Sequence, residues 1–147
     1  SLLRRALAGY EKATGPDDPN ALMAARNLGG LLAETGRPVE AIPLLERAYS
    51  ARRKQPTIGG IGGLLADAYA RTGRPADAAR VAGEVVAEGR AQLKPGSPEL
   101  GGLLAQSGKA LLDADPAAAA ACLREALAIR EKLAPAAWTT ANARSLL

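Results

Sequence analysis

Apolar residues recur along this chain at intervals of three and four, which is the spacing of one face of an α-helix. Ala41, Leu44, Leu45 and Ala48 form one such stripe, and the segment 119–129 carries another. No long stretch alternates strictly between apolar and polar residues, as a half-buried strand would. The pattern predicts helices over about 2–14, 20–35, 38–54, 58–72, 75–93, 98–113, 116–133 and 137–147.

The predicted helices are joined by turns that repeat. Thr35-Gly36-Arg37-Pro38 recurs 37 residues later as Thr72-Gly73-Arg74-Pro75, and a looser third copy is Asp113-Ala114-Asp115-Pro116. Glycine takes the left-handed conformation that ends a helix, and proline suits the first turn of the next one. Each copy therefore predicts two helices joined by a tight turn.

These turns divide the chain into one array of helix pairs. We expect a single solenoid over 1–147, with a half repeat at 1–14 (a second helix), complete repeats at 20–54, 57–93 and 97–133, and a truncated first helix at 137–147. A single pair cannot bury its own apolar face, so stacking of neighbouring pairs must supply the core.

Each unit has a small residue at its eighth position, a leucine or aromatic residue at the eleventh, and small or apolar residues at the twentieth and twenty-seventh. The carriers are Leu28-Gly29, Leu32, Ala41, Leu45 and Ala48, then Leu65-Ala66, Tyr69, Ala78, Ala82 and Val85, then Gly108, Leu111, Ala119, Leu123 and Ala126. This spacing resembles the tetratricopeptide repeat, and the 42-residue spacing across the proline-containing linkers resembles its kinesin-light-chain type. The C-terminal stretch 122–147 resembles the repeat tails of bacterial, particularly planctomycete, serine/threonine kinases.

The resemblance implies an all-α fold, a right-handed α-solenoid of antiparallel helix pairs. It also implies a concave face lined by the first helix of each pair, with the second helices outside. The departures from the family pattern are a second unit about five residues shorter and several glycines in the first helices.

Composition removes most other classes of protein. Alanine and leucine dominate, and β-branched and aromatic residues are scarce, which excludes an all-β fold. The chain has no histidine and one cysteine, Cys122, so histidine-based triads, histidine metal sites and multi-cysteine zinc clusters are excluded. We therefore expect no enzyme, no cofactor and no bound metal, and we interpret Cys122 as a small buried core residue.

Net charge and hydropathy narrow the classes of binding partner that the chain could have. The net charge of +4 is too small to indicate nucleic-acid binding. No apolar run reaches about 18 residues, so no membrane span is predicted. The chain begins at Ser1 without methionine and ends inside an apolar-patterned segment, so we expect a fragment of a longer protein, and the lack of a visible secretory signal therefore says little. We expect a cytoplasmic location.

Four local motifs have a structural interpretation beside a functional one. The glycine-rich stretch 59–63 lacks a preceding strand and a following Lys-Ser/Thr pair, so we do not expect nucleotide binding. Asp17-Asp18 is interpreted as a turn and helix start rather than a paired-carboxylate site. Arg52-Arg53-Lys54 is interpreted as the end of a helix rather than a phosphate-binding patch, and Trp138 as a packing residue between units.

The first helices supply the candidate site. In repeat register their inner positions form rows, and the candidate peptide-binding residues in these rows are Met23, Arg26, Gly30, Gly63, Asp67, Arg71, Gly102 and Lys109. The small residues should leave a smooth groove in which a partner's backbone comes close. The alternative is structural, with Asp67 paired to Lys109, and Arg71 paired to Glu34 or Asp113.

The most consistent function is binding of a protein or peptide, as an interaction module of a larger, bacterial signalling protein. Arg26 and Lys109 are the side chains expected to hold an acidic or C-terminal segment. The alternative is a spacer or self-association element with an empty groove, self-associating through its exposed terminal helices. A third surface, the outer helices around Arg52, Arg53 and Arg80, is expected if the groove is not used.

Overall fold

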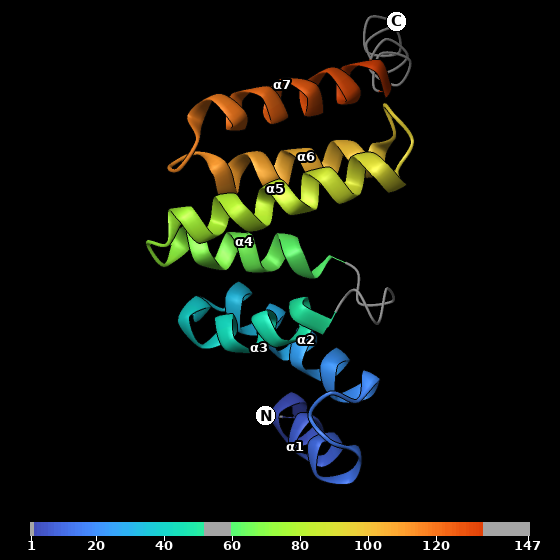
Figure 1. The fold of residues 1–147 in the computed structure, drawn as a ribbon, viewed down its shortest axis with the longest axis vertical. Coiled ribbons are helices and arrows are strands. Elements are labelled where there is room, and N and C mark those ends of the chain that lie inside the picture. Colours follow the sequence, from blue (N-terminus) through green and yellow to red (C-terminus); the bar gives the residue numbers. More distant parts are fainter. Residues whose placement is uncertain (1, 52–59, 134–147) are drawn as a thin grey trace, which may run out of the picture.

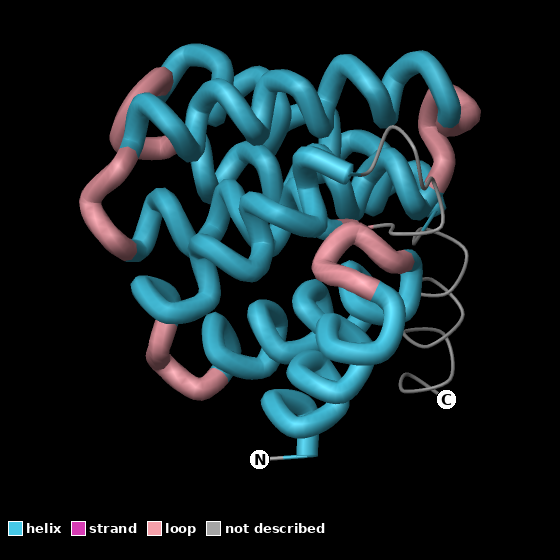
Figure 2. The backbone as a smooth tube through the Cα atoms, turned by 60° about the horizontal axis from the view of Figure 1, so that its bottom comes forward, coloured by secondary structure: helices cyan, strands magenta, loops and turns pink. Residues whose placement is uncertain are grey.

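The computed structural model describes residues 2–51 and 60–133, and within these ranges every regular element is an α-helix (Figure 2). The helices in the described ranges are α1 (Leu2–Thr14), α2 (Pro19–Glu34), α3 (Pro38–Ala51), α4 (Ile61–Arg71), α5 (Pro75–Gln92), α6 (Pro98–Leu111) and α7 (Pro116–Leu133). The predicted all-α class is confirmed. The predicted helix 137–147, the Arg52-Arg53-Lys54 run, Trp138 and Gly59 lie outside the described residues, and the repeat boundaries stay predictions.

The tight turns form as the sequence predicts. Gly36 and Gly73 take positive φ angles of 80° and 73°, and Pro38 and Pro75 begin the next helices. In each turn the amide after the glycine donates to a carbonyl five residues earlier, at 2.8 and 2.9 Å. These bonds satisfy carbonyls that the helix end would otherwise leave without a partner.

Short side chains cap the helices that follow the longer linkers. The carboxylate of Asp18 accepts the Asn20 amide at 2.9 Å, and the hydroxyl of Ser97 accepts the Leu100 amide at 3.3 Å. Capping of this kind is worth about 1 kcal/mol. The interpretation of the Asp17-Asp18 pair as a helix start is confirmed for Asp18.

The helices stack as antiparallel pairs along the long axis of the molecule (Figure 1). We call α2 with α3 the first unit, α4 with α5 the second, and α6 with α7 the third. The first helices touch in succession, α2 to α4 and α4 to α6, and each second helix also packs on the first helix of the next unit. The helix α1 packs on α2 in the same way, as the second helix of a preceding unit would.

Within each unit the two helices approach closely where the side-chain volumes are complementary. Gly29 on α2 faces Leu45 on α3, and Gly108 on α6 faces Leu123 on α7 in the same way. The second unit has Ala66 in place of the glycine and an alanine in place of the leucine. At this place in the stack, the first and third units thus pair a glycine with a leucine, whereas the second unit pairs two alanines.

Polar contacts join successive second helices. Arg47 of α3 donates to Glu11 of α1 at 2.6 Å, and Arg90 of α5 pairs with Glu125 of α7 at 2.7 Å. The hydroxyl of Tyr49 on α3 donates to Glu84 on α5. These contacts cross the gaps between second helices, which do not pack backbone against backbone. The exposed Arg90–Glu125 pair is worth about 0–1 kcal/mol.

Tyr69 on α4 is a buried tyrosine that makes a polar contact with the neighbouring unit. Its ring is 2% exposed, its hydroxyl donates to Glu46 of α3, and the Arg74 guanidinium lies 4.4 Å from the ring centroid. Burial, reinforced by the neighbouring Glu46 carboxylate, raises the pKa of Tyr69 to about 12. The folded protein therefore favours the neutral phenol.

The glycine-leucine fit gives a first prediction. A Cβ on Gly29 would lie 2.7 Å from the Leu45 side chain, which is fully buried and cannot swing aside. Gly29→Ala should lower the free energy of unfolding by about 1–3 kcal/mol, and the same substitution should cost less in a Leu45→Ala background, because the overlap is then absent. Urea unfolding measures both variants.

Gly83→Ala is the matched control, since nothing lies within 4 Å of the added Cβ. It should raise the free energy of unfolding by about 0.5–1 kcal/mol through helix propensity. Equal effects at the two glycines would show that no close approach exists at Gly29.

The pKa of Tyr69 gives a second prediction. An unfolded tyrosine loses its proton near pH 10, and the folded one at about 12. The stabilisation is therefore complete below pH 10 and is lost as the pH rises toward 12, at about 1.4 kcal/mol per pH unit. Urea unfolding across this window should show a steeper loss for the natural protein than for Tyr69→Phe. Parallel pH profiles would contradict the assignment.

Candidate functional site

A hollow of about 480 Å³ lies on the side of the stack formed by the first helices. We call it the first-helix hollow. From α2 it is lined by Arg26, Asn27, Gly30, Leu31 and Glu34, and from the other elements by Leu3, Gly60, Leu64 and Gln106. Its walls combine three leucines, two amide side chains and two oppositely charged groups, which is the mixture typical of a site for a peptide or small ligand.

Repeat register explains how this lining is assembled. Asn27, Leu64 and Gln106 are separated by 37 and 42 residues, so they occupy the same position on α2, α4 and α6. The first helices lie side by side, which brings the three side chains into one row across the hollow. The charged groups Arg26 and Glu34 are eight residues apart on α2, or about 12 Å along its axis.

Among the predicted residues, Arg26 and Gly30 line the hollow directly. The Arg26 guanidinium donates to the Asn27 side chain at 3.1 Å. Met23 is half-buried one turn earlier on α2. Lys109 is exposed on α6, one turn beyond Gln106, and does not line the hollow itself.

Two predicted glycines differ from the expected smooth groove. Gly63 is buried beneath Gln106, whose side chain would lie 2.5 Å from a Cβ there. Gly102 is exposed, but it belongs to a different hollow of about 330 Å³ between α6 and α7. The surface over Gly63 is therefore formed by the Gln106 amide rather than by the main chain.

The predicted ion pairs between units are wrong. Arg71 pairs with Asp67 of its own helix at 3.5 Å and donates to the Ala33 carbonyl of α2 at 2.8 Å. The pair Asp67–Arg71 is four residues apart, the spacing that brings side chains together on one helix face. Arg71 thus ties the first unit to the second through the backbone.

Five residues that line the hollow were not predicted from the sequence: Leu3, Asn27, Leu31, Leu64 and Gln106. The repeat register that singled out Arg26 and Gly63 also aligns Asn27, Leu64 and Gln106, one residue further on, so this row was open to prediction. Leu3 comes from α1, and its place in the hollow depends on how α1 packs against α2.

The described residues offer little for catalysis. Among residues 2–51 and 60–133 no cluster of three or more histidine, cysteine, aspartate or glutamate side chains is placed to hold a metal ion. Cys122 is buried on α7, as predicted, and burial raises the pKa of its thiol. No helix in the described part of the chain is long and apolar enough to cross a membrane.

Comparison with known proteins agrees with this geometry. Residues 1–54 match the tetratricopeptide repeat family. The structure resembles that of nearly identical TPR-like repeats in a putative kinesin light chain of Podosopora anserina, with 23% sequence identity and a TM-score of 0.76 over 91% of this chain and 66% of that one. The crystal structure of a variant of that protein with a single substitution gives 23% identity and a TM-score of 0.77, over 90% and 65% of the two chains.

The fold is a tetratricopeptide-type α-solenoid. Repeats of this family are generally protein-interaction scaffolds. The chain spans slightly less than two thirds of the length of the matched structures. No curated protein matches the chain.

The position of Arg71 gives a third prediction. Arg71→Ala removes a hydrogen bond between units and should lower the free energy of unfolding by about 1 kcal/mol. Lys109→Ala is the matched control, because this exposed side chain has no ion pair among the described residues, and its effect should stay within about 0.5 kcal/mol. Chemical unfolding of both variants checks this. Equal losses would contradict the structural role of Arg71.

Proposed function

We propose that this chain is a protein-interaction module that binds a peptide segment of another protein in the first-helix hollow. The composition of the hollow supports this proposal, because leucines lie beside amide and charged side chains in a space of about 480 Å³. Asn27 and Gln106 offer hydrogen bonds to a peptide backbone, and Leu31 and Leu64 offer contacts to its apolar side chains.

The charges favour an acidic or C-terminal segment. Arg26 lies near the middle of α2 and Glu34 at its end, so the hollow has a positive and a negative end. A carboxylate of the peptide would pair with Arg26, in the geometry that arginine offers to carboxylates. A peptide leaving past Gln106 would meet Lys109 one turn further along α6. A charged segment orients the peptide and speeds its association.

Three finer points belong to the same proposal. The resemblance of 122–147 to the tails of bacterial serine/threonine kinases supports a place in a larger, bacterial signalling protein, although 134–147 lie outside the described residues. The proposed cytoplasmic location is an expectation from the sequence alone. Self-association through the terminal helices is supported by the exposure of Leu2 on α1, and of Leu127 and Leu133 on α7.

A fourth prediction tests this function. Peptides with free C-termini are selected from a random library against the purified chain, and their affinities are measured by fluorescence anisotropy. The selected peptides should carry Asp, Glu or the C-terminal carboxylate at the contact. The double variant Arg26→Ala/Lys109→Ala should weaken binding about tenfold or more, with the free energy of unfolding within about 0.5 kcal/mol per site.

Arg124→Ala is the matched control, because Arg124 is an exposed arginine on α7 and lines no part of the hollow. It should leave the affinity unchanged. A loss of stability without a loss of affinity would mean that Arg26 and Lys109 are structural and would favour the spacer function. No change in either quantity would place the ligand on another surface, such as the outer helices around Arg80.

A further inference from the structure

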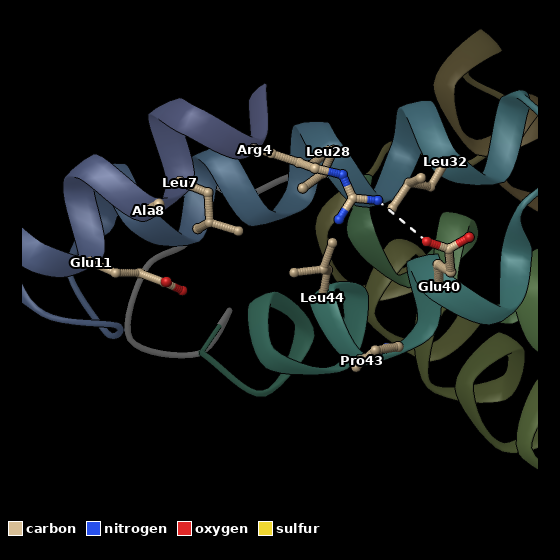
Figure 3. A pocket seen from close by; sticks show the side chains of 9 residues that line it. All are labelled: Arg4, Leu7, Ala8, Glu11, Leu28, Leu32, Glu40, Pro43 and Leu44. Carbon is tan, nitrogen blue, oxygen red and sulfur yellow. Dashed lines mark hydrogen bonds and ion pairs between the residues drawn. The ribbon is translucent and has the colours of Figure 1, made fainter. Parts of the chain in front are cut away.

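A second hollow, of about 450 Å³, opens on the other side of the stack between α1, α2 and α3. We call it the outer hollow. Its apolar walls are Leu7, Leu28, Leu32 and Leu44, whose side chains converge on one space (Figure 3). No element of the first-helix hollow other than α1 and α2 takes part in it.

Two ion pairs of opposite polarity close the ends of the outer hollow. Near the start of both helices, Arg4 of α1 donates to Glu40 of α3 at 3.3 Å. About two helical turns later, Glu11 of α1 accepts a hydrogen bond from Arg47 of α3 at 2.6 Å. The two pairs bridge α1 and α3. Figure 3 shows the Arg4–Glu40 pair beside Leu32, with Leu7 and Leu44 on the side toward Glu11.

The equivalent place in the next unit shows what fills such a space. The residue 37 positions after Leu32 is Tyr69, and the residue 42 positions after Leu7 is Tyr49. Both tyrosine rings are buried, at 2% and 6% exposure. The junction between α1 and α3 therefore has two leucines where the junction between α3 and α5 has two tyrosines.

The charged groups at the tip of the space differ in sign at one position. At the second junction the hydroxyl of Tyr69 meets Glu46, which also pairs with Arg74 at 3.9 Å. At the first junction the residue 42 positions before Glu46 is Arg4, so the tip holds the Arg4–Glu40 pair. Both its side chains are about half exposed, and Arg37 donates to the same carboxylate at 2.7 Å.

This arrangement suits a phenol more than a plain aromatic ring. A phenol oxygen accepts from an arginine while its hydrogen is donated to a carboxylate. Arg37 and Arg4 hold the pKa of Glu40 below its usual range, so this carboxylate stays an acceptor. A phenylalanine ring would fill the apolar part of the hollow but would make no hydrogen bond to the charged groups at its tip.

We propose that the outer hollow binds a tyrosine side chain of a partner protein, with its ring among Leu7, Leu32 and Leu44 and its hydroxyl between Arg4 and Glu40. The partner thus supplies from outside the aromatic group that the second unit supplies from its own sequence. This site is separate from the first-helix hollow, and its existence does not depend on the peptide bound there. One buried aromatic anchor of this kind commonly dominates the affinity of an interface.

The fifth prediction uses p-cresol, which is the side chain of tyrosine, and toluene, which lacks the hydroxyl. Titration of the leucine-methyl-labelled protein should give saturable NMR shifts at Leu7, Leu28, Leu32 and Leu44. Toluene should bind about tenfold more weakly, because it makes no hydrogen bond to the charged pair. Arg4→Met should reduce the affinity for p-cresol toward that of toluene and leave the affinity for toluene unchanged.

Leu32→Tyr should abolish the saturable shifts, because it restores the aromatic residue of the second unit and fills the hollow from within. Leu112→Tyr is the matched control, since Leu112 is an exposed leucine at the end of α6 that lines neither hollow, and it should leave p-cresol binding unchanged. Absence of saturable shifts, equal affinities for p-cresol and toluene, or full binding by Leu32→Tyr would each overturn the proposal. If Leu32→Tyr fails to fold, the affinity ratio in Arg4→Met decides.

The protein partner is tested by peptide selection against Arg26→Ala/Lys109→Ala, which leaves the outer hollow intact. Selected peptides should be enriched in tyrosine, and Leu32→Tyr should abolish their binding while Leu112→Tyr should not. Failure of this enrichment would overturn the proposal whatever the first-helix hollow binds. Self-association that Tyr10→Phe removes would mean that a second copy supplies the ring through its exposed Tyr10, and would also overturn it.

Discussion

The whole structure depends on filling the space between stacked helices with side chains of matched size. Each helix pair is too small to bury its own apolar face, so every junction must be packed by residues from two or three helices. Gly29 against Leu45 and Gly108 against Leu123 achieve this with unequal partners. Because packed interiors tolerate neither overlap nor voids, a change on one helix must be matched on its neighbour.

The same constraint explains where the two hollows lie. In the row that crosses the first-helix hollow, the long side chain of Gln106 extends from α6 over Gly63 on α4 and forms part of the wall. The outer hollow is present where leucines at positions 7 and 32 are smaller than the tyrosines at the equivalent positions 49 and 69. The repeat fixes the backbone, and side-chain volume decides which junctions keep a space for a ligand.

Much of the fold could be predicted from the sequence, because its signals are local. The Gly36-Arg37-Pro38 turn and its copy mark helix ends within a residue or two, and the apolar spacing marks the buried faces. The candidate site was predicted in part. Repeat register placed Arg26 on the face formed by the first helices, where it lines the hollow, but the position of Gln106 depends on how far a side chain reaches across the neighbouring helix. The pairing of Arg71 was wrong because contacts within a helix and with the Ala33 carbonyl competed with those between units.

The central claim is that the face formed by the first helices is the binding surface of this solenoid. Chemical-shift mapping of the backbone amides with a peptide selected against the natural protein tests it most directly. The largest shifts should cluster on α2, α4 and α6, at Asn27, Leu64 and Gln106, with small shifts on α5 and α7. Large shifts confined to α3, α5 and α7 would contradict the claim.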